Sequence, residues 1–448
     1  MRKSNNDSGL TVKRSYRRFI VGLTALAVSA AVCAQDHARL SERTIIGTAR
    51  YVGMCGAMSA IGGDPSAVKD NPAGLGLYRR MELMITTDLS LYQGDRLFTV
   101  PQASWEFSIP TDKLREAGVL YHNFMFSYHR LHTYDRIYDV QGEMDPSLGD
   151  KLASLEGVNW GDFKFCSDFY NSYNRTRVIE YGASHEFAFN WGMNVSNKWY
   201  LGAGLRVQTY NFHSSGTYAE DFARKNDEGK NMYLDNASNL HFSGAGCSAA
   251  LGLIYRPISW VRLGLGIETP SLGGINVRTS GTLTALTDSI RISPAPAQYG
   301  TDKDFHQPFR TTVSAALQVS AYGLLALQYD YRHAYFMDDV HTFKVGLEFL
   351  PVVGLYVNLG YAYESTFKPY KPAHMDQTFA RQDTYSFYPR VSQYASAAFG
   401  YRGTYMIIQA AYQYHWKQTA FYSMDDVAPW DIYGITHRIV LTLAWHRD

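Results

Sequence analysis

The stretch LLALQYDYR, residues 324–332, alternates apolar and polar side chains with a period of two. Successive side chains of a β-strand point to opposite faces, so this pattern predicts a strand with one apolar and one polar face. The apolar face would carry Leu325, Leu327, Tyr329 and Tyr331. The same alternation recurs over residues 341–350, 355–364 and 435–446. The chain is therefore predicted to be all-β.

A water-soluble β-sandwich or barrel would also alternate, so strand length and the position of aromatic side chains have to decide. The predicted strands run for about ten residues or more, which matches a tilted membrane strand better than the shorter strands of globular sheets. Tyrosine and tryptophan lie near the ends of the apolar faces, as expected for girdles at the two membrane interfaces. These residues are Trp199, Tyr255, Trp260, Tyr363, Trp416 and Trp445. Both features favour a transmembrane barrel with its apolar faces outward.

The connections alternate between short and long, which is typical of outer-membrane barrels with short periplasmic turns and long external loops. We expect long loops at residues 134–174, 214–239, 271–306, 368–388 and 423–433. About fourteen antiparallel strands are predicted, an even number as in bacterial barrels. They lie near residues 82–92, 98–108, 120–132, 177–192, 198–212, 241–256, 260–269, 308–320, 323–335, 340–350, 354–366, 390–401, 404–418 and 434–447.

A barrel of this size encloses more space than its own side chains fill, so a plug is expected inside it. Residues 35–80 precede the first strand and are rich in small side chains. Within them, GGDPSAVKDNPAGLG at residues 62–76 suggests a phosphate-binding loop. No Gly-Lys-Ser/Thr follows, and Pro65 and Pro72 lack the N–H donors that a phosphate would need. A small lumenal domain is the better interpretation.

Composition and charge narrow the possible functions. The chain has 448 residues and a net charge of +1, so no global field favours nucleic acid. Charged residues make up 19% of the chain, below the roughly 25% of soluble domains, and aromatic residues make up 15%. The mature cysteines, Cys55, Cys166 and Cys247, are too widely spaced for a disulfide framework or a zinc site, although one bridge is compatible with them.

The first 34 residues have the features of an export signal. Four basic residues between Lys13 and Arg18 precede an apolar core at residues 19–32, and Val32-Cys33-Ala34 fits a cleavage site. The predicted mature chain begins at Gln35. A lipoprotein signal using Cys33 is the alternative. The predicted organisation is a signal peptide at 1–34, a plug at 35–80 and a barrel at 81–448.

The sequence resembles the FadL/TodX family of outer-membrane transporters, in the form found among Bacteroidetes. The resemblance lies in GTAR at 47–50, GMCGA at 53–57, GDPSA at 63–67 and NPAGL at 71–75, and in barrel segments at 255–270, 323–336, 341–351 and 397–403. It implies a fourteen-stranded barrel with an N-terminal hatch that admits hydrophobic molecules, such as long-chain fatty acids, without an energy source or cofactor. Asn71, Pro72, Ala73 and Gly74 match the hatch motif.

The family's lateral opening comes from a kinked third strand. The corresponding stretch here, residues 121–131, contains no Gly or Pro to mark a kink. The sequence therefore leaves open whether a ligand would be released laterally or into the periplasm. Cys55 also stands where the family more often has glycine.

Side chains that could carry chemistry are few. Arg206, Arg262 and Arg438 lie on the predicted lumenal face and are candidates for binding an anionic head group, although charges inside a barrel usually pair with one another. His129 and His132 would lie on opposite faces of one strand, which excludes joint metal ligation. Asp425, Asp426 and Asp431 could hold calcium, but solvated loop acids are more common. No Gly-x-Ser-x-Gly motif is present, and we predict that the chain is not an enzyme and has no metal site.

Two functions are compatible with these features. The first is passive transport of a hydrophobic small molecule across the bacterial outer membrane by a monomer in contact with lipid. The second is a role like that of PorV, a relative in the same superfamily that serves type IX protein secretion. No nucleic-acid partner is expected in either case.

Overall fold

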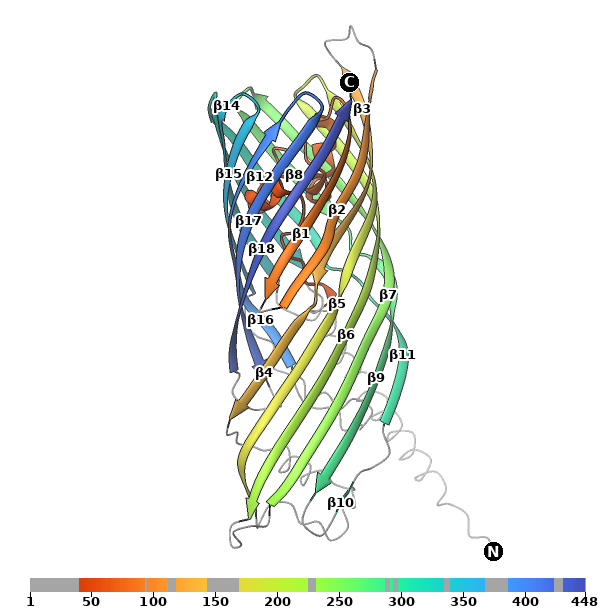
Figure 1. The fold of residues 1–448 in the computed structure, drawn as a ribbon. Coiled ribbons are helices and arrows are strands. Elements are labelled where there is room, and N and C mark those ends of the chain that lie inside the picture. The colour runs from red at the N-terminus through yellow and green to blue at the C-terminus, as the bar shows by residue number, and fades with distance from the viewer. Residues whose placement is uncertain are drawn as a thin grey trace, which may run out of the picture.

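The computed structural model describes residues 40–92, 95–111, 118–142, 169–224, 231–286, 291–292, 297–333, 339–366, 386–422 and 430–447. The predicted signal peptide lies outside these residues. All strands belong to one antiparallel sheet that closes on itself (Figure 1). Closure is made by β1 (Met81–Tyr92) and β18 (Trp430–Arg447), which pair along the whole length of β1. Closing a sheet in this way satisfies the backbone groups that hydrocarbon could not.

The other strands follow in chain order around the wall. They are β2 (Asp95–Pro110), β3 (Val119–Thr133), β4 (Arg136–Gly142), β5 (Phe169–Val195), β6 (Trp199–Arg224), β7 (Asn231–Ile258), β8 (Val261–Glu268), β9 (Leu272–Leu286), β10 (Arg291–Ile292), β11 (Ala297–Asp304), β12 (Phe309–Ser320), β13 (Gly323–His333), β14 (Val340–Val352), β15 (Leu355–Thr366), β16 (Ser386–Arg402) and β17 (Met406–Tyr422).

Eighteen strand segments make a barrel of fourteen positions, because some positions are interrupted. Both β3 and β4 pair with β5, and both β8 and β9 pair with β7. Likewise β12 pairs with β8, while β10 and β11 pair with β9. Joining β4 to β3, β9 to β8, and β10 and β11 to β12 leaves fourteen positions. The predicted number and order of strands are confirmed.

Two of the predicted external loops are wrong over much of their length, and a third is wrong near its ends. Residues 214–239 largely continue β6 and β7, and residues 271–306 contain β9 to β11. Residues 134–174 contain β4 and the start of β5, and the part between them, 143–168, lies outside the described residues. These strands project well beyond the rest of the barrel, at the bottom of Figure 1. Outside hydrocarbon a strand does not need an apolar outer face, so backbone pairing continues there after the alternation of hydropathy has ended.

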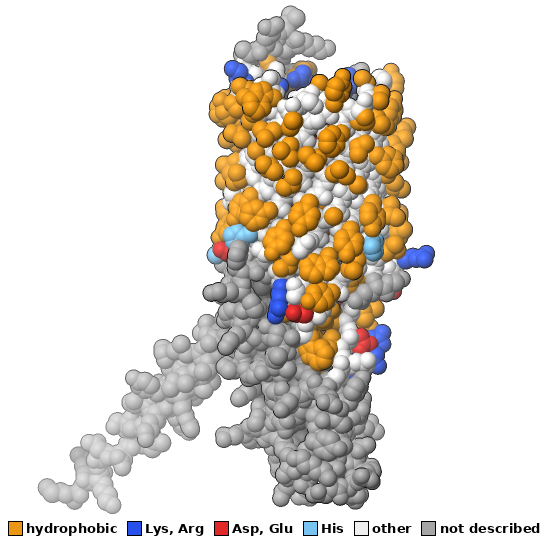
Figure 2. Space-filling model, turned by 90° about the vertical axis from the view of Figure 1, so that its left-hand side faces the viewer, with side chains coloured by type: hydrophobic (Ala, Val, Ile, Leu, Met, Phe, Trp, Pro, Cys, Tyr) orange, Lys and Arg blue, Asp and Glu red, His pale blue; other side chains and the backbone are white. Residues whose placement is uncertain are grey.

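The outer surface of the barrel is apolar and its inner surface is polar. Figure 2 shows hydrophobic side chains spread over the barrel wall. Exposed residues include Leu83, Trp105, Phe126, Leu205, Leu251, Phe343, Leu441 and Trp445, whereas the buried set includes Glu106, Arg206, Glu268, Asp330, Lys344 and Arg438. This distribution is the reverse of a soluble protein and is that of a transmembrane barrel. No described helix is both long enough and apolar enough to cross a membrane.

Residues 40–80, called the lumenal segment below, lie inside the barrel (Figure 1). The segment forms three short helices, α2 (Ala49–Gly53), α3 (Pro65–Asp70) and the 3₁₀ helix η1 (Pro72–Leu77). Side chains of Thr48, Asp64 and Asn71 accept hydrogen bonds from backbone N–H groups at the three helix starts. Helices of five or six residues are marginal by themselves. The wall of the barrel must therefore supply most of their stability.

Candidate functional site

The motif Asn71-Pro72-Ala73-Gly74 packs against the barrel wall at positions where the wall has no side chain. A Cβ atom built on Gly252 of β7 would lie 2.1 Å from the Asn71 side-chain oxygen, and one on Gly202 of β6 would lie 2.3 Å from the Pro72 carbonyl carbon. A Cβ on Gly266 of β8 would lie 2.6 Å from the backbone oxygen of Asp70. These glycines let two backbones approach closely, which any larger residue would prevent.

Asn71 joins the lumenal segment to itself and to the wall. Its side-chain amide donates to the carbonyl of Ser59 at 3.2 Å and to the carbonyl of Leu253 in β7 at 3.3 Å. Its side-chain oxygen accepts from the N–H of Ala73 at 3.1 Å and so begins η1. Asn71 is fully buried. One side chain thus fixes a turn of the segment and its position on the wall.

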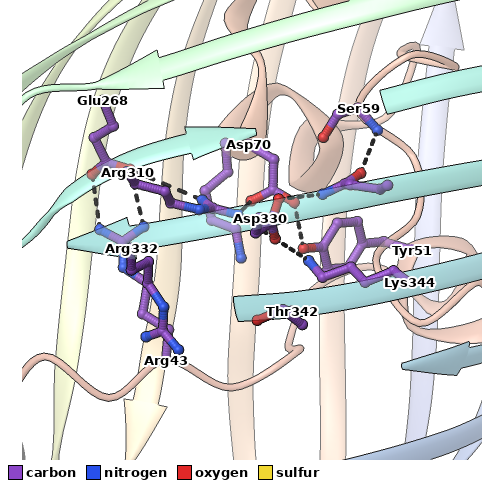
Figure 3. A network of polar contacts seen from close by, with 12 residues as sticks. Arg43, Tyr51, Ser59, Asp70, Glu268, Arg310, Asp330, Arg332, Thr342 and Lys344 are labelled. Carbon is purple, nitrogen blue, oxygen red and sulfur yellow. Dashed lines mark hydrogen bonds and ion pairs between the residues drawn. The ribbon is translucent and has the colours of Figure 1, made fainter. Parts of the chain in front are cut away.

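A network of buried charges connects α3 with three adjacent wall strands (Figure 3). The Arg310 guanidinium of β12 lies 2.8 Å from Asp70 and 3.2 Å from Asp330 of β13. Lys344 of β14 lies 2.7 Å from Asp330, and the Tyr51 hydroxyl donates to Asp70 at 2.6 Å. Burial alone would raise the pKa of Asp70, but Arg310, Lys344 and Lys69 hold it well below its usual range.

Glu268 of β8 is the second acidic centre of this network. It accepts two hydrogen bonds from the Arg43 guanidinium of the lumenal segment, at 2.8 and 3.1 Å. Arg206 of β6 lies 2.8 Å from the same carboxylate, and Arg310 lies 3.9 Å from it. Removing one member of such a buried group leaves another charge uncompensated, so the network holds the segment in one position.

Three further ion pairs hold the parts of the segment on either side of Arg43. Arg50 donates twice to Glu348 of β14, at 2.7 and 2.8 Å. Glu42 forms ion pairs with Lys417 of β17 and with Arg136 of β4, the latter at 3.3 Å. The segment is thus attached to strands around much of the barrel.

The structure gives each of the three predicted head-group arginines a partner. Arg206 binds Glu268 and donates to the Lys69 carbonyl at 2.7 Å. Arg262 donates to the Ile61 carbonyl at 2.9 Å. Arg438 lies 2.8 Å from Asp88 and donates to the Ile45 carbonyl at 3.3 Å. All three contact the lumenal segment and are not gathered around one empty space.

The barrel wall is not paired continuously between β2 and its neighbour. Pairing of β2 with β3 runs from Pro110↔Tyr121 to Gln102↔His129 and no further among the described residues. Beyond this point, among the described residues, 95–99 of β2 pair with β1 and 130–142 of β3 and β4 pair with β5, while the Leu131 carbonyl accepts from the N–H of Thr44 in the lumenal segment. The wall therefore has an opening, which we call the β2–β4 gap.

The pairing of β3 is interrupted just after residues 121–131, the stretch that contains no Gly or Pro to mark a kink. The register of β3 with β5 shifts between Arg130 and His132, and the strand stops at Tyr134 and Asp135 before β4 begins. Gly182 of β5 faces this break with a φ of 123° and accepts from the N–H of Tyr134 at 3.0 Å. The glycine that marks the kink is on the neighbouring strand, because that strand carries the unusual backbone conformation.

A cavity of about 370 Å³ lies at the β2–β4 gap. It is lined on one side by residues that face outward from the barrel, including the exposed Ile179 and Tyr181 of β5. On the other side it reaches the buried His415 and Lys417 of β17. The cavity is therefore lined from both the outer face and the lumen, and Thr44 of the lumenal segment lies beside it.

The remaining candidates are spread over the barrel, as far as the structure describes them. The prediction that His129 and His132 lie on opposite faces is wrong, because both are buried. The register shift between Arg130 and His132 turns His132 inward, where it reaches Thr44 at 2.6 Å. Asp425 and Asp426 lie outside the described residues, while Asp431 pairs with Arg390 at 3.0 Å. Within the described chain no group of three or more His, Cys, Asp or Glu side chains could hold a metal ion. Cys55 and Cys247 are unpaired, and Cys166 lies outside the described residues.

Sequence reasoning did not identify Arg43, Asp70 or Arg310 as members of one site. Their separation along the chain hides the contact, since Asp70 and Arg310 are 240 positions apart. The wall glycines did carry a signal, because an isolated glycine in a strand indicates close approach of another backbone. That rule applied to Gly202, Gly252 and Gly266 would have predicted the part of the wall against which the lumenal segment packs.

No protein-family model matches the sequence, and no curated protein matches it. Similar folds occur among solved structures. A FadL homologue from Pseudomonas aeruginosa is 13% identical, covers 91% of this chain and 100% of its own, and has a TM-score of 0.53. The CymD monoaromatic hydrocarbon channel is 12% identical, covers 91% of this chain and 99% of its own, and also has a TM-score of 0.53. The chain thus has the fold of FadL-type barrels, and the predicted resemblance is confirmed at the level of fold.

Proposed function

We propose that this protein, which has the fold of FadL-type barrels, is a passive outer-membrane transporter of hydrophobic small molecules. The observation that carries the proposal is the cavity at the β2–β4 gap, which connects the outer face of a plugged barrel with its lumen. A porin would need an open aqueous channel, whereas here the lumenal segment occupies the interior. A side route through the wall suits a molecule that partitions into lipid.

The lining of the cavity favours an amphipathic ligand such as a long-chain fatty acid. Leu97, Ile137 and Ile179 supply apolar surface to the cavity. Lys417 and Arg136 lie at the inner end, where both are paired with Glu42 of the plug. An anionic head group could compete with Glu42 for these cations, while the apolar tail remains at the gap.

The same competition would couple ligand binding to the plug. Burial would raise the pKa of Glu42, but Arg136, Lys417 and His132 lower it well below its usual range, so this carboxylate is held as an anion. Replacing Glu42 with a ligand carboxylate at these cations would free the start of the lumenal segment from the wall. A movement of the segment around the hatch motif, Asn71, Pro72, Ala73 and Gly74, would then open the way for the ligand to leave the lumen.

Filling the cavity tests the proposal. Thr419 is a buried cavity-lining residue of β17, and Thr419→Trp would occupy much of the space. We expect uptake of radiolabelled oleate by cells lacking their own transporter to fall about tenfold or more, since the route is blocked sterically. Leu359→Trp on the exposed outer face is the matched control and should leave uptake unchanged.

Two results would contradict the proposal. One is that Thr419→Trp, folded in the membrane, takes up oleate and toluene at the same rates as the wild-type chain. The other is co-purification of the wild-type chain with exported proteins and without any retained lipid or hydrocarbon, which would favour the PorV-like role instead.

A further inference from the structure

A row of four basic and aromatic side chains crosses the outer face of the extended strands. Tyr181 of β5, His213 of β6, His241 of β7 and Arg278 of β9 are paired in register on consecutive strands. The rings of Tyr181 and His213 are stacked with centroids 4.6 Å apart, and those of His213 and His241 with centroids 4.0 Å apart. We call these four residues the histidine row.

The histidine row lines a groove of about 460 Å³. Gly300 of β11 continues the row beyond Arg278 and leaves open space there, because it has no side chain. The next row along the strands adds small polar side chains, Ser215, Asn239 and Ser280, to the groove. The lining thus combines two imidazoles and one guanidinium with hydroxyl and amide groups.

Other outward-facing histidines of this barrel have a different arrangement. The Tyr128 hydroxyl bonds His185 Nδ1 at 2.8 Å, and the Tyr412 hydroxyl bonds His437 Nδ1 at 2.7 Å. In those pairs one ring nitrogen is already used. In the part of the chain that the structure describes, His213 and His241 make ring contacts without a hydrogen bond to a side chain. Their nitrogens are free to bind a ligand.

Arg278 is oriented by neighbours and is not neutralised by them. Its Nε donates to the side-chain oxygen of Asn276 at 3.0 Å, and the Asn276 amide donates to Asp302 at 2.8 Å. Asp302 therefore positions the amide that positions the guanidinium. Among the described residues no carboxylate forms an ion pair with Arg278, His213 or His241. Three nitrogen groups that can be cationic converge with no fixed anion between them.

The position of the row relates it to the membrane. On β6 the outward residues Leu205 and Val207 are 67% and 45% exposed and apolar, and Thr209, Asn211 and His213 follow them along the strand. On β7 the outward Leu251 is 63% exposed, and His241 lies ten positions before it, farther along the barrel. The row therefore lies beyond the apolar band, where lipid head groups begin.

We propose that the histidine row binds the phosphate group of an outer-leaflet lipid. A phosphate offers several acceptor oxygens to a guanidinium and to imidazole N–H groups, and charge-assisted hydrogen bonds of this kind are stronger than those between neutral groups. The acyl chains of the same lipid would lie on the apolar outer face below the row. Such a site anchors the projecting strands to the membrane surface and lies next to the cavity at the β2–β4 gap, which Tyr181 also lines.

Native mass spectrometry of the full chain in detergent micelles tests this site. The probes are diphosphoryl lipid A, the same lipid without phosphates, and inorganic phosphate. We expect the diphosphoryl lipid to bind about tenfold more tightly than the phosphate-free lipid, and Arg278→Gln combined with His241→Gln to remove this preference. His437→Gln, an outward histidine outside the row, is the control and should retain it. Arg278→Lys should restore part of the preference.

Three outcomes would overturn the proposal. The preference could persist in the double variant, or be lost equally in His437→Gln. Inorganic phosphate could bind as well as the lipid and displace it completely at equal concentration, which would make the row a site for free phosphate. Circular dichroism of each variant establishes that the barrel is folded, so loss of binding cannot be assigned to misfolding.

Discussion

Gly252→Ala should detach the plug motif from the barrel wall. The added Cβ would lie 2.1 Å from the Asn71 side-chain oxygen, 2.6 Å from the Ala73 nitrogen and 3.0 Å from Pro72 Cδ. Two of these atoms belong to a turn that cannot rotate away, so either the strand or the turn must move. Overpacking of this kind costs about 1–3 kcal/mol. Loss of the hydrogen bond from Asn71 to the Leu253 carbonyl adds about 1 kcal/mol.

The sum is about 3 kcal/mol against docking of the segment, which corresponds to a roughly hundredfold larger undocked fraction. Hydrogen exchange followed by mass spectrometry measures this directly, because amides of α3 and η1 exchange through the undocked state. We expect their exchange to become about a hundredfold faster while that of β13 and β14 is unchanged. Gly300→Ala is the control, since its Cβ would have no atom nearer than 3.9 Å.

The reasoning is refuted if Gly252→Ala leaves exchange in α3 and η1 at the wild-type rate. It is also refuted if exchange rises equally throughout the barrel, because the substitution would then act on the strand and not on the plug.

Two further predictions concern charge. Asp330→Asn deprives Lys344 of its carboxylate partner and should lower the free energy of unfolding, measured by urea titration, by about 3 kcal/mol. The control Asp431→Asn, at the exposed pair with Arg390, should lower it by less than about 1 kcal/mol. Equal effects of the two substitutions would contradict the importance of the buried network. Burial lowers the pKa of Lys69 to about 8 from an ordinary value of 10.5, although Asp70 opposes this shift. The docked state therefore becomes more stable by up to about 3 kcal/mol as the pH rises from 8 to 10.5, and it loses this stability as the pH falls again. Exchange of α3, corrected for intrinsic rates, should slow over that range in the wild type and not in Lys69→Met, and a slope that survives the substitution would refute the assignment.

The sequence predicts the strands correctly where they cross the membrane and less well where they extend beyond it. Residues 323–335 and 340–350 were predicted as strands, and β13 and β14 span Gly323–His333 and Val340–Val352. Their outer faces lie in the apolar band, which imposes the alternation that the sequence displays. The distal parts of β5, β6 and β7 were predicted as loops because apolar and polar side chains no longer alternate regularly there. Only pairing with the neighbouring strands specifies them.

The candidate site was also predicted only in part. The motif at Asn71 could be located from its glycines and prolines together with the family resemblance, since turn formers are local signals. Its partners could not, because Gly252 and Arg310 reach it only after the barrel has closed. The β2–β4 gap was also invisible, since the glycine at the break, Gly182, is on a different strand from the one that stops.

The sequence by itself determined that this chain is a barrel of about fourteen strands with apolar faces outward and a small-residue segment before the first strand. These properties depend on the period of the side chains along one strand, and each strand records that period locally. Only the tertiary structure decided which charges hold the plug, where the wall opens and which outward side chains form the histidine row. Those features depend on strand register and closure, which bring together residues hundreds of positions apart.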